Sequence, residues 1–187
     1  GLTGTMDIGL AHATISGSGF TIGGAVQGNL GRLTLADGTF GWTAGVIRGG
    51  FGVVVANTGI LDLSGTPFKD LDSGTLTNNG TINHEGIGNL RFINTTNNFI
   101  HNQAGAVYHF KGDVDFAGFN GSGVVNNAGT FRKSNATANP TTPTTSTTSG
   151  SVVFNNTGGT LDVHSGTLEL TDGGTNTGGT WTVAAGT

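Results

Sequence analysis

The feature that most constrains this chain is a recurring turn motif, in which Asn is followed by one or more intervening residues and then Gly, ahead of a short strand-like segment. Its anchor pairs are Asn57 and Gly59, Asn78 and Gly80, Asn102 and Gly105, Asn126 and Gly129, and Asn155 and Gly159. The glycines of successive pairs are 21, 25, 24 and 30 residues apart. A recurrence on this scale is typical of architectures in which similar units stack on one another.

The segments between the turns alternate between apolar and polar residues. Leu61 and Leu63 are separated by a polar residue, and Leu168 and Leu170 flank Glu169 in the same way. Side chains of a strand point to opposite faces with a period of two, so each segment predicts a strand with one buried and one wet face. Helices are not expected, because 36 glycines interrupt the chain and Gly disfavours helix interiors.

Two architectures produce short alternating strands at regular spacing: an antiparallel β-sandwich and a parallel solenoid. We expect an all-β, right-handed parallel β-helix with coils of about 20–25 residues, because the same turn residues return at similar spacing. Stacked coils would place each Asn above the Asn of the previous coil, where side-chain amides can bond along the axis. The neighbouring Gly would supply the positive φ of a sharp turn.

Residues 1–187 are predicted to form a single solenoid domain or fragment. The widest spacing contains a Thr/Pro-rich stretch, residues 135–149, which we interpret as a loop inserted into one coil. Both ends of the chain fall within the repeat pattern and show no polar cap. Solenoids need capping repeats, so the expected partners are further coils of the same protein or identical subunits stacked end to end.

Charge and composition argue against several classes of protein. Only 7 residues are Lys or Arg and the net charge is -4, so no basic stripe for nucleic acid is expected. No apolar run approaches the ~20 residues of a membrane-spanning helix. The chain has no Cys, which removes disulfides, thiolate metal sites and cysteine nucleophiles.

The C-terminal residues 166–187 read GTLELTDGGTNTGGTWTVAAGT. This segment resembles the passenger repeats of bacterial autotransporters, and it is similar to other secreted β-helix adhesins, including two-partner secretion exoproteins. It departs from the autotransporter pattern where that family commonly has an aromatic, at Gly174 or Thr175. The resemblance implies a β-helical stalk that is extracellular or on the cell surface, and it carries over no catalytic residue.

Acidic and histidine residues are the candidates for a chemical site. Asp113 and Asp115 are two residues apart and predict a pair on one strand face, which we interpret as a surface pair flanking core residues. The alternative is a Ca²⁺ or acid/base pair of the kind found in polysaccharide-degrading β-helices. Asp162 and His164 are likewise interpreted as a surface pair. No catalytic residue, metal site or cofactor is predicted.

Aromatic residues are candidates for contact with sugars, because ring faces can stack on them. The candidates are Trp42, Phe51, Tyr108, Phe119 and Trp181. We expect most of them to fill the core, with Trp42 pointing inward.

The functional expectation is a structural or adhesive segment of a secreted or cell-surface bacterial protein, not an enzyme, which forms a rod or fibre by coil stacking. The alternative is a glycan-binding or polysaccharide-degrading β-helix, with host or environmental glycans as partners. Ice binding is disfavoured, because the variable repeat spacing breaks any regular rank of Thr residues.

Overall fold

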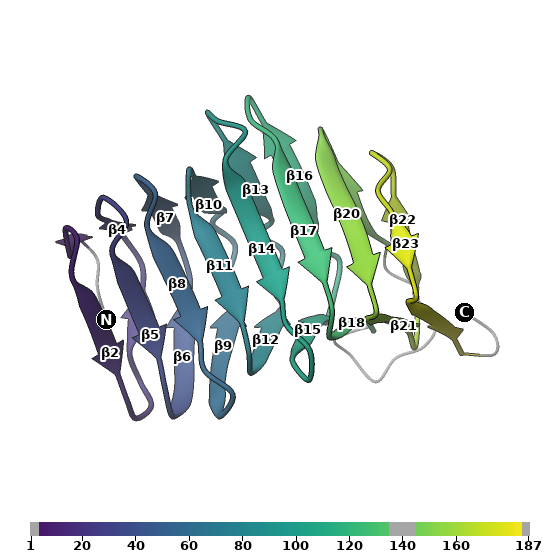
Figure 1. Cartoon of the computed structure of the whole chain (residues 1–187), viewed down its shortest axis with the longest axis horizontal. Helices are drawn as coiled ribbons and strands as arrows, with labels where there is room; N and C mark the ends of the chain where they lie inside the picture. Colours follow the sequence, from purple (N-terminus) through teal and green to yellow (C-terminus); the bar gives the residue numbers. More distant parts are fainter. Residues whose placement is uncertain (1–3, 135–144, 185–187) are drawn as a thin grey trace.

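A computed structural model describes residues 4–134 and 145–184, and within them the chain is an all-β parallel solenoid without helices. The backbone winds through three sheets, and each sheet contains eight parallel strands (Figure 1). Strands of one sheet lie side by side in sequence order along the long axis of the molecule.

Each coil contributes one strand to each sheet. The first sheet contains β1 (Thr5–Asp7), β4 (Ala25–Gln27), β7 (Gly45–Arg48), β10 (Lys69–Asp72), β13 (Leu90–Ile93), β16 (Phe116–Phe119), β19 (Thr145–Ser149) and β22 (Thr167–Leu170). The second contains β2 (His12–Ile15), β5 (Arg32–Leu35), β8 (Gly52–Val55), β11 (Thr75–Asn78), β14 (Asn98–Asn102), β17 (Gly123–Asn127), β20 (Val152–Thr157) and β23 (Asn176–Thr177). The third contains β3 (Thr21–Ile22), β6 (Gly38–Trp42), β9 (Gly59–Leu63), β12 (Thr81–His84), β15 (Val107–Phe110), β18 (Thr130–Lys133), β21 (Thr160–Val163) and β24 (Thr180–Val183).

Pairing between coils confirms the parallel solenoid and excludes the sandwich alternative. In the third sheet, Leu61 of β9 pairs with Ile82 of β12, which pairs in turn with Tyr108 of β15. These partners are one coil apart, and a coil contains about 23 residues. The strands therefore bond to the next coil and not to their immediate sequence neighbours, as a hairpin would require.

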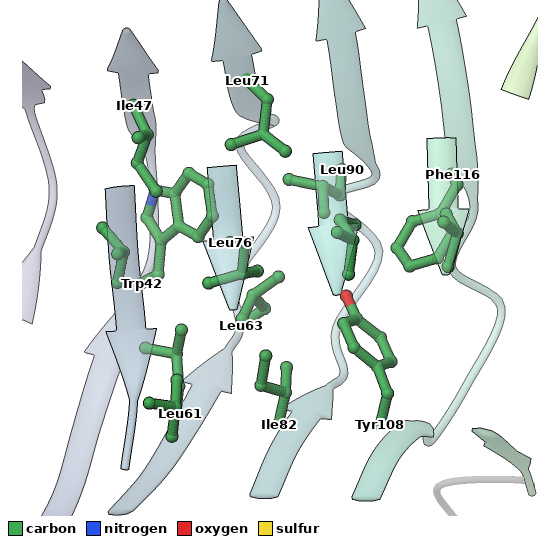
Figure 2. Packing of buried hydrophobic residues seen from close by; sticks show 14 of the residues in the cluster. Trp42, Ile47, Leu61, Leu63, Leu71, Leu76, Ile82, Leu90, Tyr108 and Phe116 are labelled. Carbon is green, nitrogen blue, oxygen red and sulfur yellow. The ribbon is translucent and has the colours of Figure 1, made fainter. Parts of the chain in front are cut away.

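The core is a continuous stack of apolar side chains between the three sheets (Figure 2). The alternation places Leu61 and Leu63 inside, both fully buried, and Trp42 points inward as predicted. Tyr108 and Phe116 lie in an aromatic part of the core, with ring centroids 5.2 Å apart. Close packing of this kind along the whole stack gives the chain a single core.

The loop predicted for the Thr/Pro-rich residues 135–149 does not extend to residue 149. Residues 145–149 form β19 of the first sheet, which pairs with β16 and β22, while residues 135–144 lie outside the described part of the chain. The sequence of β19 is TSTTS, and its inward side chains are Ser146 and Thr148, both buried. No apolar alternation marked this strand, so the prediction of a loop through residue 149 was wrong.

Candidate functional site

A row of asparagines runs along the corner between the second and third sheets, and its first four members are buried while the last is exposed. The Asn row contains Asn78, Asn102, Asn127, Asn156 and Asn176, one from each of five successive coils. Each Nδ2 donates to the Oδ1 of the next member, at 2.8, 2.7, 2.8 and 2.8 Å in that order. The side-chain amides therefore form one chain of hydrogen bonds parallel to the solenoid axis.

The same amides also hold the turn backbone. Asn78 Nδ2 donates to the carbonyl of Val107 at 2.9 Å, and Asn102 Nδ2 donates to that of Thr130 at 3.0 Å. The backbone amide of Gly80 donates to Asn78 Oδ1 at 3.1 Å. Buried polar groups of a turn are costly when they lack partners, so the Asn row supplies what water would otherwise supply.

The predicted anchors fall on this row only in part. Asn78 and Asn102 belong to it, but Asn126 and Asn155 point outward and bond to each other at 3.1 Å, beside the buried Asn127 and Asn156. In these two pairs the second residue faces inward, whereas in Asn78-Asn79 the first one does, and only the strand register decides this. Asn57 is exposed in the turn after β8, where Val55 occupies the position in register with Asn78.

The anchor glycines are needed mainly for space. A Cβ on Gly80 would lie 2.2 Å from the Ala56 carbonyl oxygen, and a Cβ on Gly129 would lie 2.4 Å from that of Ala106. The positive φ predicted for these glycines is found at Gly105, where φ is 83°, but not at Gly59, Gly80, Gly129 or Gly159. Gly is used there because the backbone of the preceding coil approaches too closely for any side chain.

Two lysines are buried at the corner between the third and first sheets. Lys69 Nζ donates to the carbonyls of Pro67 and Gly88, at 3.1 and 3.4 Å. Lys133 Nζ donates to the carbonyls of Gly112 and Ser134, at 2.8 and 3.3 Å. Burial lowers the pKa of both side chains to about 8.

Each of these lysines links the turns of successive coils. Their burial was missed from the sequence, although the alternation with Leu71 and Phe131 places both lysines on the inward face. That signal was available but was outweighed by the general exposure of Lys.

His84 is a neutral structural residue of the same corner. Its Nε2 lies 3.1 Å from the Gly88 carbonyl oxygen, and its Nδ1 lies 3.3 Å from the Tyr108 hydroxyl. The carbonyl requires a donor, so Nε2 carries the hydrogen and Nδ1 accepts from the hydroxyl. Burial, with a smaller contribution from the nearby Lys69, lowers the pKa of His84 to about 3.

The acidic pair of the sequence does not form a joint site. Asp113 is exposed, and Asp115 is half-buried in the turn before β16, not on a strand. Asp115 accepts from the backbone amide of Thr147 at 2.7 Å and from Asn89 Nδ2 at 3.1 Å. Burial raises its pKa. Among the described residues, no group of three or more His, Asp or Glu side chains is arranged to hold a metal ion.

An aromatic surface patch lies on the outer face of the first sheet. We define it as Phe68, Arg91 and Phe119, together with Asp70, the ion-pair partner of Arg91. The Arg91 guanidinium carbon lies 4.1 Å from the centroid of the Phe68 ring and 5.1 Å from that of Phe119. Arg91 Nε and Nη2 donate to the two carboxylate oxygens of Asp70, at 2.7 and 2.9 Å. The patch is therefore a fixed arrangement of rings around a neutralised charge.

The aromatic candidates divide between core and surface. Trp42, Phe51 and Tyr108 are fully buried, whereas Phe119 and Trp181 are exposed. Phe68 was not singled out from the sequence, because it precedes its strand and has no alternation signal. Asp162 and His164 do form a pair, with 3.0 Å between Oδ2 and Nε2, but only His164 lies at the surface as predicted: Asp162 is buried and also binds Arg132.

These features define the chain as a parallel β-solenoid whose corners are held by rows of polar side chains. Comparison with protein-family models, with curated protein sequences and with solved structures finds no match to the chain. No helix among residues 4–134 and 145–184 is long and apolar enough to cross a membrane.

Removing the middle of the Asn row should destabilise the fold. In Asn102→Ala, the side-chain Nδ2 of Asn78 and the side-chain Oδ1 of Asn127 each lose a buried partner. We therefore expect the free energy of unfolding to fall by about 2–4 kcal/mol. Urea denaturation monitored by circular dichroism measures it. The control Asn57→Ala, at an exposed anchor, should change stability by less than about 0.5 kcal/mol. Equal effects would contradict the structural role of the row.

Acid should destabilise the protein through His84. Between pH 6.5 and about 3 the unfolded chain binds a proton that the folded chain excludes, so the free energy of unfolding should fall as the pH drops through this window. His84→Leu should reduce that dependence, because Leu has no group to protonate. Leu should fit at this position, because Leu63 occupies the same row one coil earlier. Denaturant titrations at several pH values test this. The control Phe110→Leu, one coil later, should shift stability equally at every pH. Parallel curves for wild type and His84→Leu would refute the assignment.

Proposed function

We propose that this chain is a structural or adhesive shaft segment of a secreted or cell-surface bacterial protein. The observation that carries the proposal is the unbroken stack of three eight-stranded sheets around one core. Seven steps of ~4.8 Å between neighbouring strands give a length of roughly 34 Å along the axis. Because each coil contacts chiefly its neighbours, such a stack lengthens in proportion to the number of coils.

The state of the buried ionisable groups supports a structural role. Lys69, Lys133 and His84 have no exposed surface, and each bonds to a turn carbonyl. Their hydrogen bonds hold successive turns together. Because these three side chains are buried and bonded within the fold, they cannot reach a substrate. The resemblance of residues 166–187 to autotransporter passenger repeats adds the expectation of an extracellular location.

The shaft proposal predicts rods. Negative-stain electron microscopy of the full-length gene product should show rods whose length grows by ~4.8 Å for each coil in the sequence. Antibody labelling of intact cells should detect the segment without permeabilisation. Compact globules, or labelling that requires permeabilised cells, would contradict the proposal.

A second candidate function is glycan contact through the aromatic surface patch. Phe68 is 48% exposed and Phe119 is 55% exposed, which is unusual for large apolar side chains. The faces of their rings carry negative charge density and attract the polarised C–H groups of a sugar. Asp70 beside them offers carboxylate oxygens to sugar hydroxyls, and the ion pair leaves the patch without net charge, which favours a neutral glycan.

The glycan candidate is tested by calorimetric titration with neutral β-linked hexasaccharides of glucose and of N-acetylglucosamine. We expect the double variant Phe68→Ala and Phe119→Ala to weaken binding at least about tenfold, since ring stacking supplies most of the contact. Leu30→Ala is the control, because Leu30 is an exposed apolar residue in the turn between β4 and β5, away from the aromatic surface patch. Binding that is absent, or equal in the double variant, would reject this function.

A further inference from the structure

A polar groove runs along the outer face of the first sheet, on the side of the stack. It is a hollow of about 620 Å³, and its lining includes Asp7, Gln27, Arg48 and Asp72, which come from β1, β4, β7 and β10 in turn. These four residues, by which we define the polar groove, form one outward row, because each pairs in register with the next. The groove therefore runs parallel to the solenoid axis over four coils.

Arg48 differs from the other arginines that lie beside an aspartate. Among the described residues, three arginines pair in register with an aspartate of a neighbouring coil. Two of them bind that aspartate, Arg91 to Asp70 at 2.7 Å and Arg132 to Asp162 at 2.8 Å. Arg48 and Asp72 have the same placement but form no ion pair, so their charged groups stay available in the groove.

Gln27 binds Arg48 from the side opposite Asp72. Gln27 Oε1 accepts from Arg48 Nε at 2.7 Å, and Gln27 Nε2 donates to Asp7 Oδ2 at 3.0 Å, so the arginine is the end of a hydrogen-bonded chain. Asp72 Oδ2 accepts from Asn94 Nδ2 at 3.1 Å. Within residues 4–134 and 145–184, neither the Arg48 Nη nitrogens nor Asp72 Oδ1 has a hydrogen-bond partner. The groove thus offers unused donors on one coil and an unused acceptor on the next.

Donor and acceptor side by side restrict the chemistry of a ligand. A carboxylate or phosphate only accepts hydrogen bonds, and the carboxylates of Asp7 and Asp72 would repel it. An ammonium group only donates, and Arg48 would repel it. A hydroxyl group both donates and accepts, so a neutral molecule with several hydroxyl groups can bind Arg48 and Asp72 together. The groove therefore favours a neutral sugar.

The polar groove continues into the aromatic surface patch. Asp72 of the groove and Asp70 of the patch are two residues apart on β10, where both side chains point outward between the buried Lys69 and Leu71. The patch then extends along the same sheet to Phe119 at the end of β16. From β1 to β16 there are five steps of ~4.8 Å, so groove and patch together span roughly 24 Å.

We propose that the polar groove and the aromatic surface patch form one binding face for a neutral glycan chain that lies parallel to the solenoid axis. Sugar rings at one end of the chain stack on Phe68 and Phe119, and hydroxyl groups further along bind the Nη nitrogens of Arg48 and the free oxygen of Asp72. The inference rests on the glycan function proposed above, and it adds the orientation of the ligand and the need for several sugar units.

Ligand length separates the two parts of this face. Calorimetric titrations compare β-linked disaccharides and hexasaccharides of glucose and of N-acetylglucosamine. We expect Arg48→Gln to weaken binding of the hexasaccharide about tenfold, because hydrogen bonds from a charged donor are lost. The same variant should leave binding of the disaccharide within about twofold of the wild type, because a disaccharide stacked on the rings does not reach Arg48. Asp72→Asn should act likewise, whereas the double variant Phe68→Ala and Phe119→Ala should weaken both ligands.

Arg32→Gln is the matched control, because Arg32 is an exposed arginine on the second sheet and its loss changes the net charge equally. Circular dichroism checks that each variant folds, which is expected because Arg48 is exposed. Three outcomes overturn the inference: hexasaccharide binding that Arg48→Gln leaves unchanged, equal weakening of both ligand lengths, or equal weakening by Arg32→Gln. If only the ring variant weakens binding, the glycan function stands without the groove, whereas a wild type that binds neither ligand rejects both.

Discussion

The structure depends on parallel, in-register backbone pairing between successive coils. Because every strand bonds to the strand one coil away, each residue lies directly above its counterpart, and side chains of one kind accumulate in rows. Apolar rows become a continuous core, and amide rows become a chain of hydrogen bonds. The register that satisfies the backbone hydrogen bonds thus also determines which side chains meet. A shift of one residue in the pairing of a strand would turn its buried side chains outward and its exposed ones inward.

Polar side chains inside the stack serve the turns. A solenoid must turn three times in each coil, and each turn leaves carbonyl and amide groups that cannot join a sheet. Asn78 and Asn102 satisfy such groups at one corner, and Lys69 and Lys133 do so at another. Burial of a lysine is normally unfavourable, and its lowered pKa reflects that cost. Hydrogen bonds to turns of successive coils offset it by linking segments distant in sequence.

The two proposed roles use different faces of one scaffold. The stack concerns extension along the axis, where the core and the Asn row run from coil to coil. The aromatic surface patch concerns contact from the side, where Phe68 and Phe119 are held by Arg91. A rigid repeat scaffold permits this separation, because outward side chains of a coil can vary without disturbing the register that the inward ones maintain.

The sequence by itself determined the repeat, the strand alternation and the stacking of Asn at a corner, because turn chemistry and period-two patterning are local properties. It could not identify β19, whose TSTTS sequence has no apolar alternation and becomes a strand only through pairing with β16 and β22. It could not decide which Asn of Asn126 and Asn127 faces inward, since both suit a turn and only the register separates them. The alternation with Leu71 and Phe131 did indicate that Lys69 and Lys133 face inward, but only the tertiary structure brought turn carbonyls of successive coils to their Nζ atoms, and it brought Phe68, Arg91 and Phe119 together from three coils. Those contacts join residues far apart in the chain, and their distances are fixed by stacking, a property that no local pattern contains.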